Sequence, residues 1–341
     1  MPEPIGFGVI GLGVWGETHL MAYTADPLSR LAGICDLNET LARGRADQYN
    51  CPFVTTDYHE LLARDDISAV SIVTPDFLHR EIAVAAAKAG KHILLEKPMA
   101  TTVEDAEAIA KAADDAGVLL MVDFHNRWNP AFTKTKQAIL DGQIGEPQMI
   151  SLKLNDAFFV PTKMLSWAGR STVVWFLGAH SVDLVRWLFD DEVVRVYAVS
   201  RSKVLTAAGV DTPDFFHYIV ELSRGGVAHI ENCWILSDNM PTIFDFKFEL
   251  VGDRGTIFAD LSTHRTLQTY SADEAAYPDL AVRYDVHGRP AGFGVESIRS
   301  FIRAVVEGAP LPVSPRDGVE NTRVLVAVHE SARTGLPVDL K

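Results

Sequence analysis

The residues of this sequence that can do chemistry begin with three glycines near its N-terminus. Gly11, Gly13 and Gly16 form the pattern G-x-G-x-x-G between the apolar run Ile5 to Ile10 and a helical pattern. Glycines at this spacing allow a tight turn and let a pyrophosphate approach the N-terminus of the following helix. A tight turn without a ligand is the alternative interpretation. We predict a dinucleotide site that comprises Gly11, Leu12, Gly13, Val14, Trp15 and Gly16.

A carboxylate follows the next apolar run. Asp36 stands 25 residues after Gly11, and Leu37 and Asn38 come next without a basic residue. Such a carboxylate accepts hydrogen bonds from the ribose hydroxyls of adenosine and repels a 2′-phosphate. We therefore predict NAD rather than NADP as the cofactor, with Asp36 and Leu37 in its site.

Polar residues also follow two later apolar runs. They are Thr74 and Pro75, with His79 shortly after, and then Glu96, Lys97 and Pro98. Ligands of open α/β sheets bind beyond the carboxyl ends of the strands, so Lys97 is expected beside the nicotinamide. Desolvation there favours the neutral amine, which can exchange a proton with a substrate hydroxyl. A solvated surface lysine is the alternative interpretation.

These residues need strands and helices to position them. In the first 125 residues short apolar runs alternate with helical patterns, which is typical of a parallel sheet with helices on both faces. The expected strands are Ile5 to Ile10, Leu31 to Cys35, Ala69 to Thr74, His92 to Glu96 and Val118 to Phe124. The expected helices are Val14 to Ala25, Thr40 to Gln48, Phe77 to Ala89 and Val103 to Ala116. We predict a doubly wound, dinucleotide-binding α/β domain over residues 1–124.

The pattern changes after residue 125. The expected strands are Gln148 to Leu154, Val193 to Ser200, Phe215 to Ser223, Val227 to Ile235, Phe244 to Val251 and Gly255 to Asp260. The expected helices are Asn129 to Leu140, Phe293 to Glu307 and Pro315 to Arg333, and the expected loops are Gly209 to Pro213 and Glu274 to Gly292. Grouped strands predict an open, mostly antiparallel sheet in an α+β domain over residues 125–341.

Composition excludes several classes of function. The 341 residues carry a net charge of −14, which provides no positive field for nucleic acid or an anionic membrane. No apolar run reaches the length of a membrane span, and no signal peptide is evident. Three cysteines and eleven histidines show no metal-ligand spacing. We expect a reduced, cytoplasmic protein without a metal.

The order of short motifs along the chain resembles the Gfo/Idh/MocA oxidoreductases, the glucose–fructose oxidoreductase and inositol dehydrogenase group. Beside the glycine turn, the matching motifs are Thr74-Pro75, Glu96-Lys97-Pro98, 126–130, 145–147, 178–183, 252–255 and 331–335. The resemblance implies an N-terminal Rossmann domain, a C-terminal domain with a large open sheet, and NAD(P)-dependent redox chemistry on sugars or polyols. It also implies a homodimer or homotetramer, which we expect to form through the C-terminal sheet.

The resemblance assigns roles to a few residues. Lys97 becomes the catalytic lysine and His180 its partner on the substrate, while Asp183, three residues after His180, is expected to be structural. One position departs from the inositol dehydrogenase pattern, because Phe176 stands where an aspartate is common. Either Lys97 and His180 suffice, or Asp156 supplies the carboxylate. Phe176, Trp175 and Trp167 provide a stacking platform for a sugar ring or are ordinary core aromatics.

Further residues complete the predicted site. Asn126 is expected at the cofactor, and Arg127 either binds substrate or forms an ion pair between the domains. The expected substrate-binding residues are Arg127, Asn155, Asp156, Trp167, Phe176 and His180. Three functions fit: an NAD-dependent dehydrogenase of a sugar, glycoside or cyclic polyol; an enzyme that recycles tightly bound NAD during elimination or glycoside cleavage; and a non-catalytic sugar sensor. The retained Lys97 and His180 favour the first.

Overall fold

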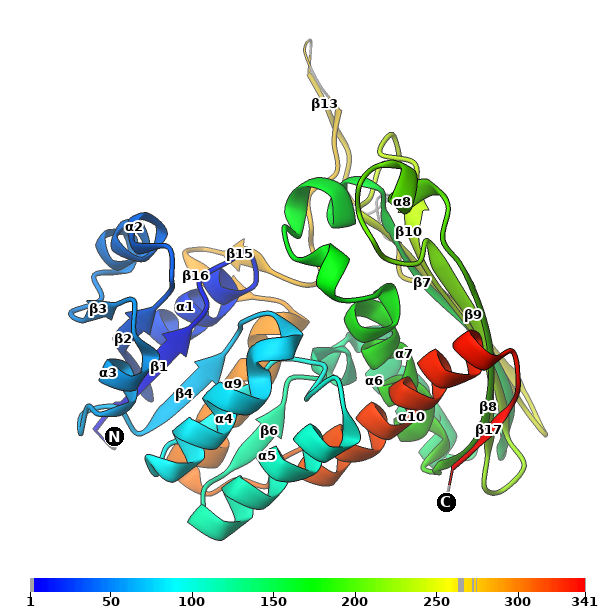
Figure 1. Cartoon of the computed structure of the whole chain (residues 1–341), viewed down its shortest axis with the longest axis horizontal. Coiled ribbons are helices and arrows are strands. Elements are labelled where there is room, and N and C mark those ends of the chain that lie inside the picture. Colours follow the sequence, from blue (N-terminus) through cyan, green and yellow to red (C-terminus); the bar gives the residue numbers. More distant parts are fainter. Residues whose placement is uncertain (1–2, 263–266, 272, 274, 341) are drawn as a thin grey trace. The chain divides into compact units, whose positions relative to one another are not determined.

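The computed structural model describes residues 3–262, 267–271, 273 and 275–340. The chain forms two compact units, Met1–Trp128 with Ala281–Val319 and Asn129–Leu280 with Glu320–Lys341 (Figure 1). The sequence analysis divides the chain once, between residues 124 and 125, whereas the first compact unit also takes in residues 281–319. The single division into domains 1–124 and 125–341 stays a prediction.

The first unit is built on a parallel six-stranded sheet in the order β3-β2-β1-β4-β5-β6. The strands are β1 Ile5–Ile10, β2 Ser29–Cys35, β3 Val54–Thr55, β4 Ala69–Ile72, β5 His92–Leu95 and β6 Leu120–Val122. Nearly all of β1, β2, β4, β5 and β6 is buried, because helices cover both faces of a sheet of this kind. The strand order reverses beside β1, which places the carboxyl ends of β1 and β4 at a topological switch point.

Helices of this unit begin and end where local chemistry favours it. They are α1 Gly16–Ala25, α2 Glu39–Tyr49, α3 Tyr58–Leu62, α4 His79–Lys88, α5 Val103–Ala116 and α9 Phe293–Glu307. The Thr102 hydroxyl accepts the backbone N–H of Asp105 at 3.1 Å, and Gly117 ends α5 with φ +65°. The apolar face of α9 packs on α1 and β5, so this late segment completes the core of the first unit.

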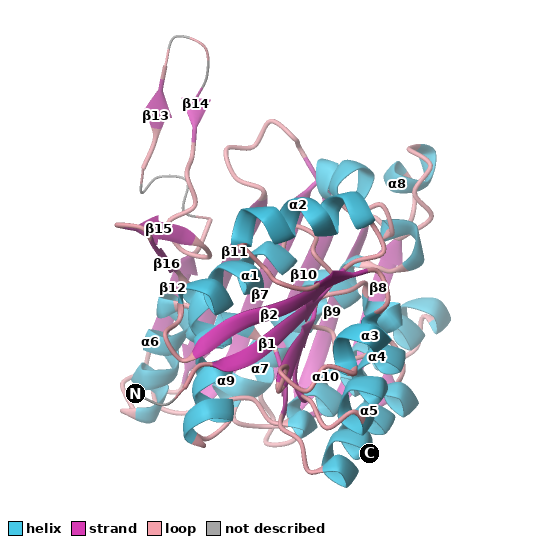
Figure 2. Ribbon diagram, turned by 90° about the vertical axis from the view of Figure 1, so that its left-hand side faces the viewer, coloured by secondary structure: helices cyan, strands magenta, loops and turns pink. Residues whose placement is uncertain are grey.

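The second unit is built on a seven-stranded sheet in the order β12-β11-β7-β10-β9-β8-β17 (Figure 2). The strands are β7 Pro147–Ala157, β8 Val193–Arg201, β9 Phe215–Leu222, β10 Val227–Leu236, β11 Phe244–Gly252, β12 Thr256–Asp260 and β17 Val338–Asp339. Only β7 and β10 pair in parallel among the described residues, which confirms the mostly antiparallel prediction. Burial alternates along β9 and β10, so one face of the sheet lies on the core and the other is exposed.

Helices cover the inner face of this sheet. They are α6 Pro130–Leu140, α7 Ala179–Phe189 and α10 Pro315–Thr334, whose first residues belong to the first unit, while the short α8 Val204–Ala207 lies in the connection from β8 to β9. Two π-helical turns, Val160–Met164 and Val174–Gly178, lie between β7 and α7. Ser314 and Asp317 exchange hydrogen bonds that cap the start of α10.

Two predictions about elements need correction. The sequence does not predict β3, α3, α8 or β17, of which β3 and β17 have only two residues each and so carry no readable period. It also assigns a loop to Glu274 to Gly292, where the structure has the strands β14 Ala275–Ala276, β15 Tyr284–Val286 and β16 Arg289–Ala291. β14 pairs with β13 Thr269–Tyr270. These strands are too short for side-chain alternation, and backbone pairing with a neighbour defines them.

The cysteines and the helix composition can be compared with the predictions of free thiols and of no membrane span. Cys35, Cys51 and Cys233 are all free thiols. Among the described residues, no helix has both the length and the apolar composition that a membrane crossing requires.

Candidate active site

The glycine turn after β1 has a shape that only glycine permits at two positions. Gly11 adopts φ +93°, and a Cβ there would lie 2.4 Å from the carbonyl oxygen of Val73. A Cβ on Gly16 would lie 2.3 Å from the carbonyl oxygen of Gly11. A Cβ on Gly13 meets nothing within 4 Å, so open space lies beside this turn at the N-terminus of α1. The turn therefore fits a pyrophosphate group.

Asp36 holds this turn against the end of β2. Its Oδ2 accepts the backbone N–H of Leu12 and its Oδ1 accepts that of Asn38, both at 2.8 Å. The side chain of Leu37 is 85% exposed and that of Val14 is 62% exposed, although both are apolar. An anionic group flanked by exposed aliphatic side chains suits an adenosine, whose ribose offers hydroxyl donors and whose base offers an apolar face.

The loop after β4 presents a hydroxyl to the same region. The Thr74 hydroxyl is buried and has no hydrogen-bond partner within the described part of the chain. A polar atom left in this way is costly unless a ligand satisfies it, which fits the predicted cofactor contact. His79 differs: its Nδ1 lies 2.8 Å from the carbonyl oxygen of Pro98 and its Nε2 lies 2.9 Å from that of Thr74. His79 therefore connects the two loops, and burial lowers its pKa.

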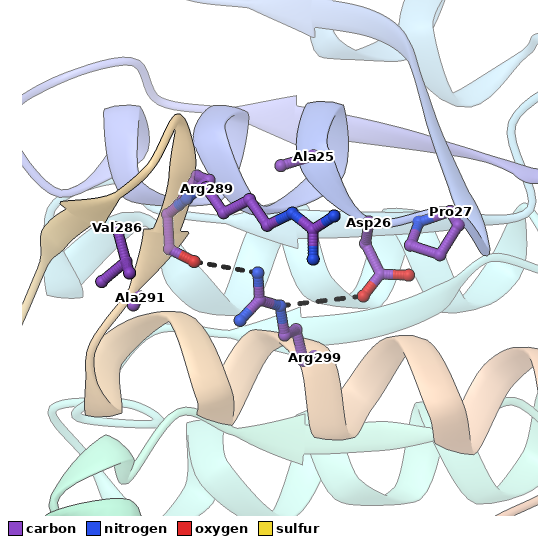
Figure 3. Close-up of a pocket in the computed structure, with 8 residues that line it drawn as sticks. Ala25, Asp26, Pro27, Val286, Arg289, Ala291 and Arg299 are labelled. Carbon is purple, nitrogen blue, oxygen red and sulfur yellow. Dashed lines mark hydrogen bonds and ion pairs between the residues drawn. The ribbon is translucent and has the colours of Figure 1, made fainter.

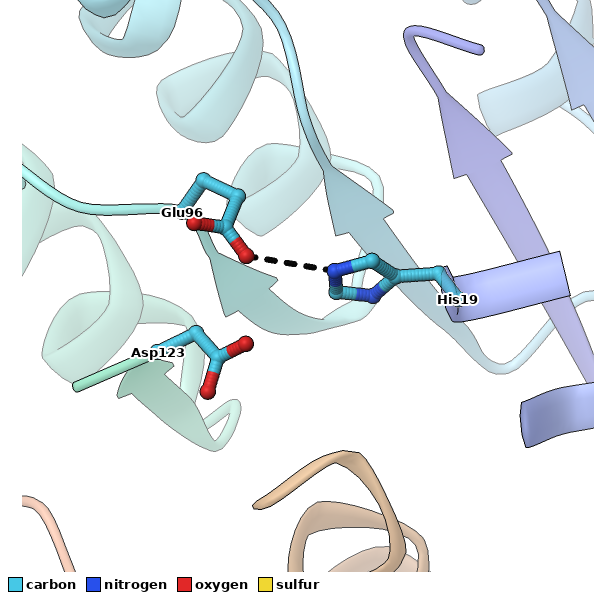
Figure 4. A group of neighbouring side chains, drawn as sticks. All are labelled: His19, Glu96 and Asp123. Carbon is cyan, nitrogen blue, oxygen red and sulfur yellow. Dashed lines mark hydrogen bonds and ion pairs between the residues drawn. The ribbon is translucent and has the colours of Figure 1, made fainter. Parts of the chain in front are cut away.

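Lys97 lies directly after the end of β5, between buried titratable groups. It follows Glu96, whose side chain contacts His19 of α1, and Asp123 follows the end of the neighbouring strand β6 (Figure 4). Burial raises the pKa of the Glu96 carboxyl, and the Lys97 ammonium partly opposes this rise. Burial and the Lys97 charge together lower the pKa of His125 well below its usual value. His79 and His125, whose pKa values are lowered, are thus neutral neighbours of a lysine that is half-buried.

Arg127 contacts residues of its own unit. Its Nη2 lies 3.1 Å from Oδ1 of Asp317, and its Nη1 donates to the carbonyl oxygen of Pro312 at 3.2 Å. Burial raises the pKa of Asp317, but the Arg127 guanidinium and Ser314 outweigh it and leave the pKa lowered. This ion pair lies within one unit and not between domains as the alternative expects, and substrate binding by Arg127 stays a prediction. Asn126, one residue earlier, is 5% exposed.

The second unit places His180 at the start of α7. The preceding π-helical turn Val174–Gly178 contains Phe176, and π-helical turns often occur at functional sites. Gly178 fits tightly there, because a Cβ would lie 3.2 Å from both Asn232 Oδ1 and the Tyr218 hydroxyl oxygen. His180 is 6% exposed. The local packing therefore fixes the position of the His180 backbone closely.

The other predicted substrate residues divide into aromatic and polar ones. Phe176 lies between Trp167 and Trp234, at ring-centroid distances of 6.1 and 5.7 Å. Asn155 and Asp156 are buried at the end of β7, and Asn155 donates to Glu231 Oε1 at 2.6 Å. Phe176 and Trp167 are partly exposed, whereas Trp234 is fully buried, so the first two remain available to a sugar ring.

Comparison with known proteins assigns this arrangement to a family. A profile described as "Oxidoreductase family, NAD-binding Rossmann fold" (GFO_IDH_MocA) matches residues 5–124, and the profile of its "C-terminal alpha/beta domain" matches residues 136–340. The chain belongs to the Gfo/Idh/MocA oxidoreductase family. The resemblance and the α/β fold inferred from sequence are thereby confirmed, as is NAD as the family's cofactor.

Relatives of this Gfo/Idh/MocA protein include characterised dehydrogenases. The chain is 29% identical over 317 residues to inositol 2-dehydrogenase of Rhizobium meliloti, covering 92% of this chain and 93% of the relative. It is 28% identical to levoglucosan dehydrogenase of Pseudarthrobacter phenanthrenivorans, covering 99% and 98% of the two chains. A solved structure of levoglucosan dehydrogenase with NADH and L-sorbose superimposes with a TM-score of 0.84 at 27% identity, covering 99% of each chain.

Two features of this family member were not expected from its sequence. The first is the buried group His19, Glu96 and Asp123, of which only Glu96 was singled out (Figure 4). A polar residue directly after an apolar strand was the available signal for Asp123. The second is a pocket of about 580 Å³ lined by the end of α1, the β15–β16 hairpin and Arg299 (Figure 3). Arg299 there donates to the carbonyl oxygen of Pro290 at 2.9 Å, and the predicted site residues lie outside the pocket lining.

Proposed function

We propose that this protein is an NAD-dependent dehydrogenase that oxidises a secondary alcohol of a sugar, glycoside or cyclic polyol, with Lys97 as the proton acceptor. The setting of Lys97 carries the proposal. It stands at the carboxyl end of β5, and burial keeps the neighbouring His19 and His125 neutral, with the pKa of His19 lowered to about 4. The substrate class follows from the relatives named inositol and levoglucosan dehydrogenase.

The residues that hold the cofactor act at three strand ends. The glycine turn at Gly11 to Gly16 would bind the pyrophosphate. The Asp36 carboxylate would accept hydrogen bonds from the ribose hydroxyls, and the cofactor would supply a hydrogen-bond partner for the Thr74 hydroxyl. Bound NAD supplies the hydride acceptor. The remaining contribution of the chain is to orient the substrate and to handle one proton.

Lys97 and His180 share the proton handling in this proposal. The neutral Lys97 amine accepts the proton of the reacting hydroxyl as the carbinol carbon loses its hydride. His180 donates a hydrogen bond to, or accepts a proton from, the same oxygen. Because Phe176 cannot accept a proton, the two residues act without an aspartate at that position. Trp167 and Phe176 present aromatic surface to the apolar face of a sugar ring.

The test is a substrate screen that follows NADH absorbance. The purified protein is incubated with NAD or NADP and a panel of inositols, sugars and anhydrosugars at several pH values. Dehydrogenase activity gives net NADH with at least one compound. NAD-dependent product formation without net NADH supports the recycling mechanism instead, and sugar binding without any turnover supports a sensor.

Cofactor choice gives a specific expectation at Asp36. Asp36→Ala should weaken NAD binding, because the acceptor of the ribose hydroxyls is lost. It should also reduce the ratio of NAD affinity to NADP affinity, because the carboxylate that repels a 2′-phosphate is gone. It also removes the acceptor of the Leu12 N–H, so thermal unfolding should be recorded beside fluorescence titration with both cofactors. Equal affinity of the unmodified protein for NAD and NADP would show that Asp36 does not select the cofactor.

The exposed face of the second sheet supports a homodimer or homotetramer. Strand register places Tyr197 beside Ile219 on this face and Phe258 further along the same row, beyond the polar residues of the three strands between them. Tyr197, Ile219 and Phe258 are 43%, 43% and 71% exposed. Large apolar side chains exposed on an open sheet favour burial against a second copy. Sedimentation of a monomer at micromolar concentration would contradict this assembly.

A further inference from the structure

The group of buried side chains beside Lys97 contains two carboxyl groups. Leu95 of β5 pairs with Val122 of β6, so Glu96 and Asp123, which follow them, are neighbours at one edge of the sheet. His19 contributes the third polar side chain. One ring nitrogen of His19 and one carboxyl oxygen each of Glu96 and Asp123 all lie within 4.8 Å of one another. Glu96 is 6% exposed, and His19 and Asp123 are fully buried. The Glu96 and Asp123 carboxyl groups thus share one water-excluded space (Figure 4).

Donation from Tyr23 toward Glu96 along a chain of hydrogen bonds would stabilise Glu96 as the ionised carboxyl group. The Tyr23 hydroxyl lies 2.5 Å from Ser71 Oγ, and Ser71 Oγ lies 2.9 Å from Nδ1 of His19. Donation along this direction leaves the proton of a neutral His19 on Nε2, which lies 3.2 Å from Glu96 Oε1. The backbone N–H of Lys97 also donates to the Glu96 carboxylate. Glu96 therefore has donors that stabilise a negative charge.

Asp123 has no comparable support. Neither oxygen of its carboxyl group makes a well-formed hydrogen bond with an N–H or O–H donor of the described residues. The Ser297 hydroxyl of α9 favours an ionised Asp123 but donates to the carbonyl oxygen of Gly294 at 3.0 Å, and His125 Nδ1 is 3.9 Å from Asp123 Oδ2. An ionised Asp123 would be buried next to a second negative charge without a donor of its own, and this raises its free energy.

We propose that Asp123 and Glu96 hold one proton between them, carried on Asp123, and that this proton limits the negative charge beside Lys97 to one unit. The second part rests on the proposed function of Lys97. The groups that face the pair are His19 and Tyr23 of α1, Lys97 and His125. Burial and the Glu96 charge raise the pKa of Asp123, while His19 remains neutral because burial lowers its pKa.

The consequence for Lys97 is a balance of charges. One carboxylate beside the ammonium gives a neutral pair, and a second carboxylate would stabilise the ammonium further and delay its deprotonation. A protonated Asp123 therefore acts as a positioning residue, since it donates a hydrogen bond to Glu96 without adding charge. When two buried carboxyl groups share a proton, the pair loses its two protons at well-separated pH values.

Infrared spectroscopy tests the proton itself on the full-length protein. At neutral pH the wild type should show the C=O band of an un-ionised carboxylic acid, and Asp123→Asn should remove it. Asp214→Asn is the matched control, because Asp214 is a buried carboxylate whose oxygens accept three backbone N–H groups, and the band should persist. Absence of the band in the wild type overturns the proposal even if a variant fails to fold.

Kinetics then test the effect on Lys97. Asp123→Asn should leave the position of the pH–rate profile unchanged, because one neutral group replaces another. The double variant Glu96→Gln/Asp123→Asn removes the one negative charge and should move the rising limb to lower pH by about one unit, the scale of a neighbouring charge. An equal shift in Asp123→Asn alone overturns the proposal. So does one bound divalent metal ion per wild-type chain, since a cation would then occupy the place of the proton.

Stability against pH gives a readout that needs no turnover. A carboxyl group whose pKa is raised by folding binds its proton more tightly in the folded protein. The wild type should therefore lose stability as the pH rises from the unfolded pKa of an aspartate through the raised pKa of the pair. The Tm of Asp123→Asn should fall less than the Tm of the wild type over the same pH range. If Lys97→Met retains turnover while the infrared band is present, the proposed role of Lys97 fails and the shared proton stands.

Discussion

Lys97→Met is expected to lower kcat by about 10²–10⁴-fold, the usual contribution of a positioned proton-transfer group. Methionine keeps most of the length and apolar character of the lysine side chain but cannot accept a proton. Affinity for NAD should change little, because the glycine turn, Asp36 and Thr74 hold the cofactor in the proposed site. Steady-state kinetics on the best substrate, with NAD titrated separately, measure both quantities.

Lys91→Met is the matched control for this experiment. Lys91 is buried, whereas Lys97 is half-buried, and it lies at the other end of β5, where its Nζ donates to the carbonyl oxygens of Arg64 and Ile67, both at 2.8 Å. Its replacement should reduce stability and leave kcat close to that of the wild type. Near-normal turnover of Lys97→Met would mean that another group carries the proton and that the mechanism proposed for this lysine is wrong.

The sequence predicted those parts of the fold that depend on local patterns. The glycine turn and the buried parallel strands were readable because Gly11 and Gly16 have no substitute there and because β1, β4 and β5 are continuous apolar runs. The caps at Thr102 and Ser314 are equally local, since a cap involves residues only three positions apart. Short-range chemistry leaves a signal in the sequence.

Contacts between distant segments left no such signal. His19 and Glu96 are 77 residues apart, and Arg127 and Asp317 are 190 apart, so no spacing rule could pair them. The segment of α9 packs in the first unit although it follows the second in the chain. Only the folded strand order brings Asp123 beside Glu96, because β5 and β6 are neighbours and end in register. Lys97 and His180 belong to different units, and their pairing stays a prediction.

His180→Ala is expected to lower kcat as well and to change the pH profile. An imidazole that exchanges a proton with the reacting oxygen contributes a titration that alanine removes. The variant leaves the backbone of α7 in place, because the Ala179 carbonyl oxygen still accepts Asn321 Nδ2 at 2.9 Å. His329→Ala is the matched control. Its ring is partly buried, Nδ1 donates to the Leu325 carbonyl oxygen at 2.7 Å, and Nε2 lies 2.8 Å from the Thr172 hydroxyl oxygen. Stability should fall in this control without a change in the pH profile.

The double variant Lys97→Met/His180→Ala decides whether the two residues act on one proton. Residues that form a catalytic unit are strongly non-additive, so the second substitution should cost little once the first has been made. Residues that act independently give losses that multiply. If the double variant loses the product of the two single effects, His180 serves substrate binding or orientation apart from Lys97, and the single lysine carries the proton alone. If the loss equals that of Lys97→Met, the proton passes between the hydroxyl, His180 and Lys97 as the proposed function requires.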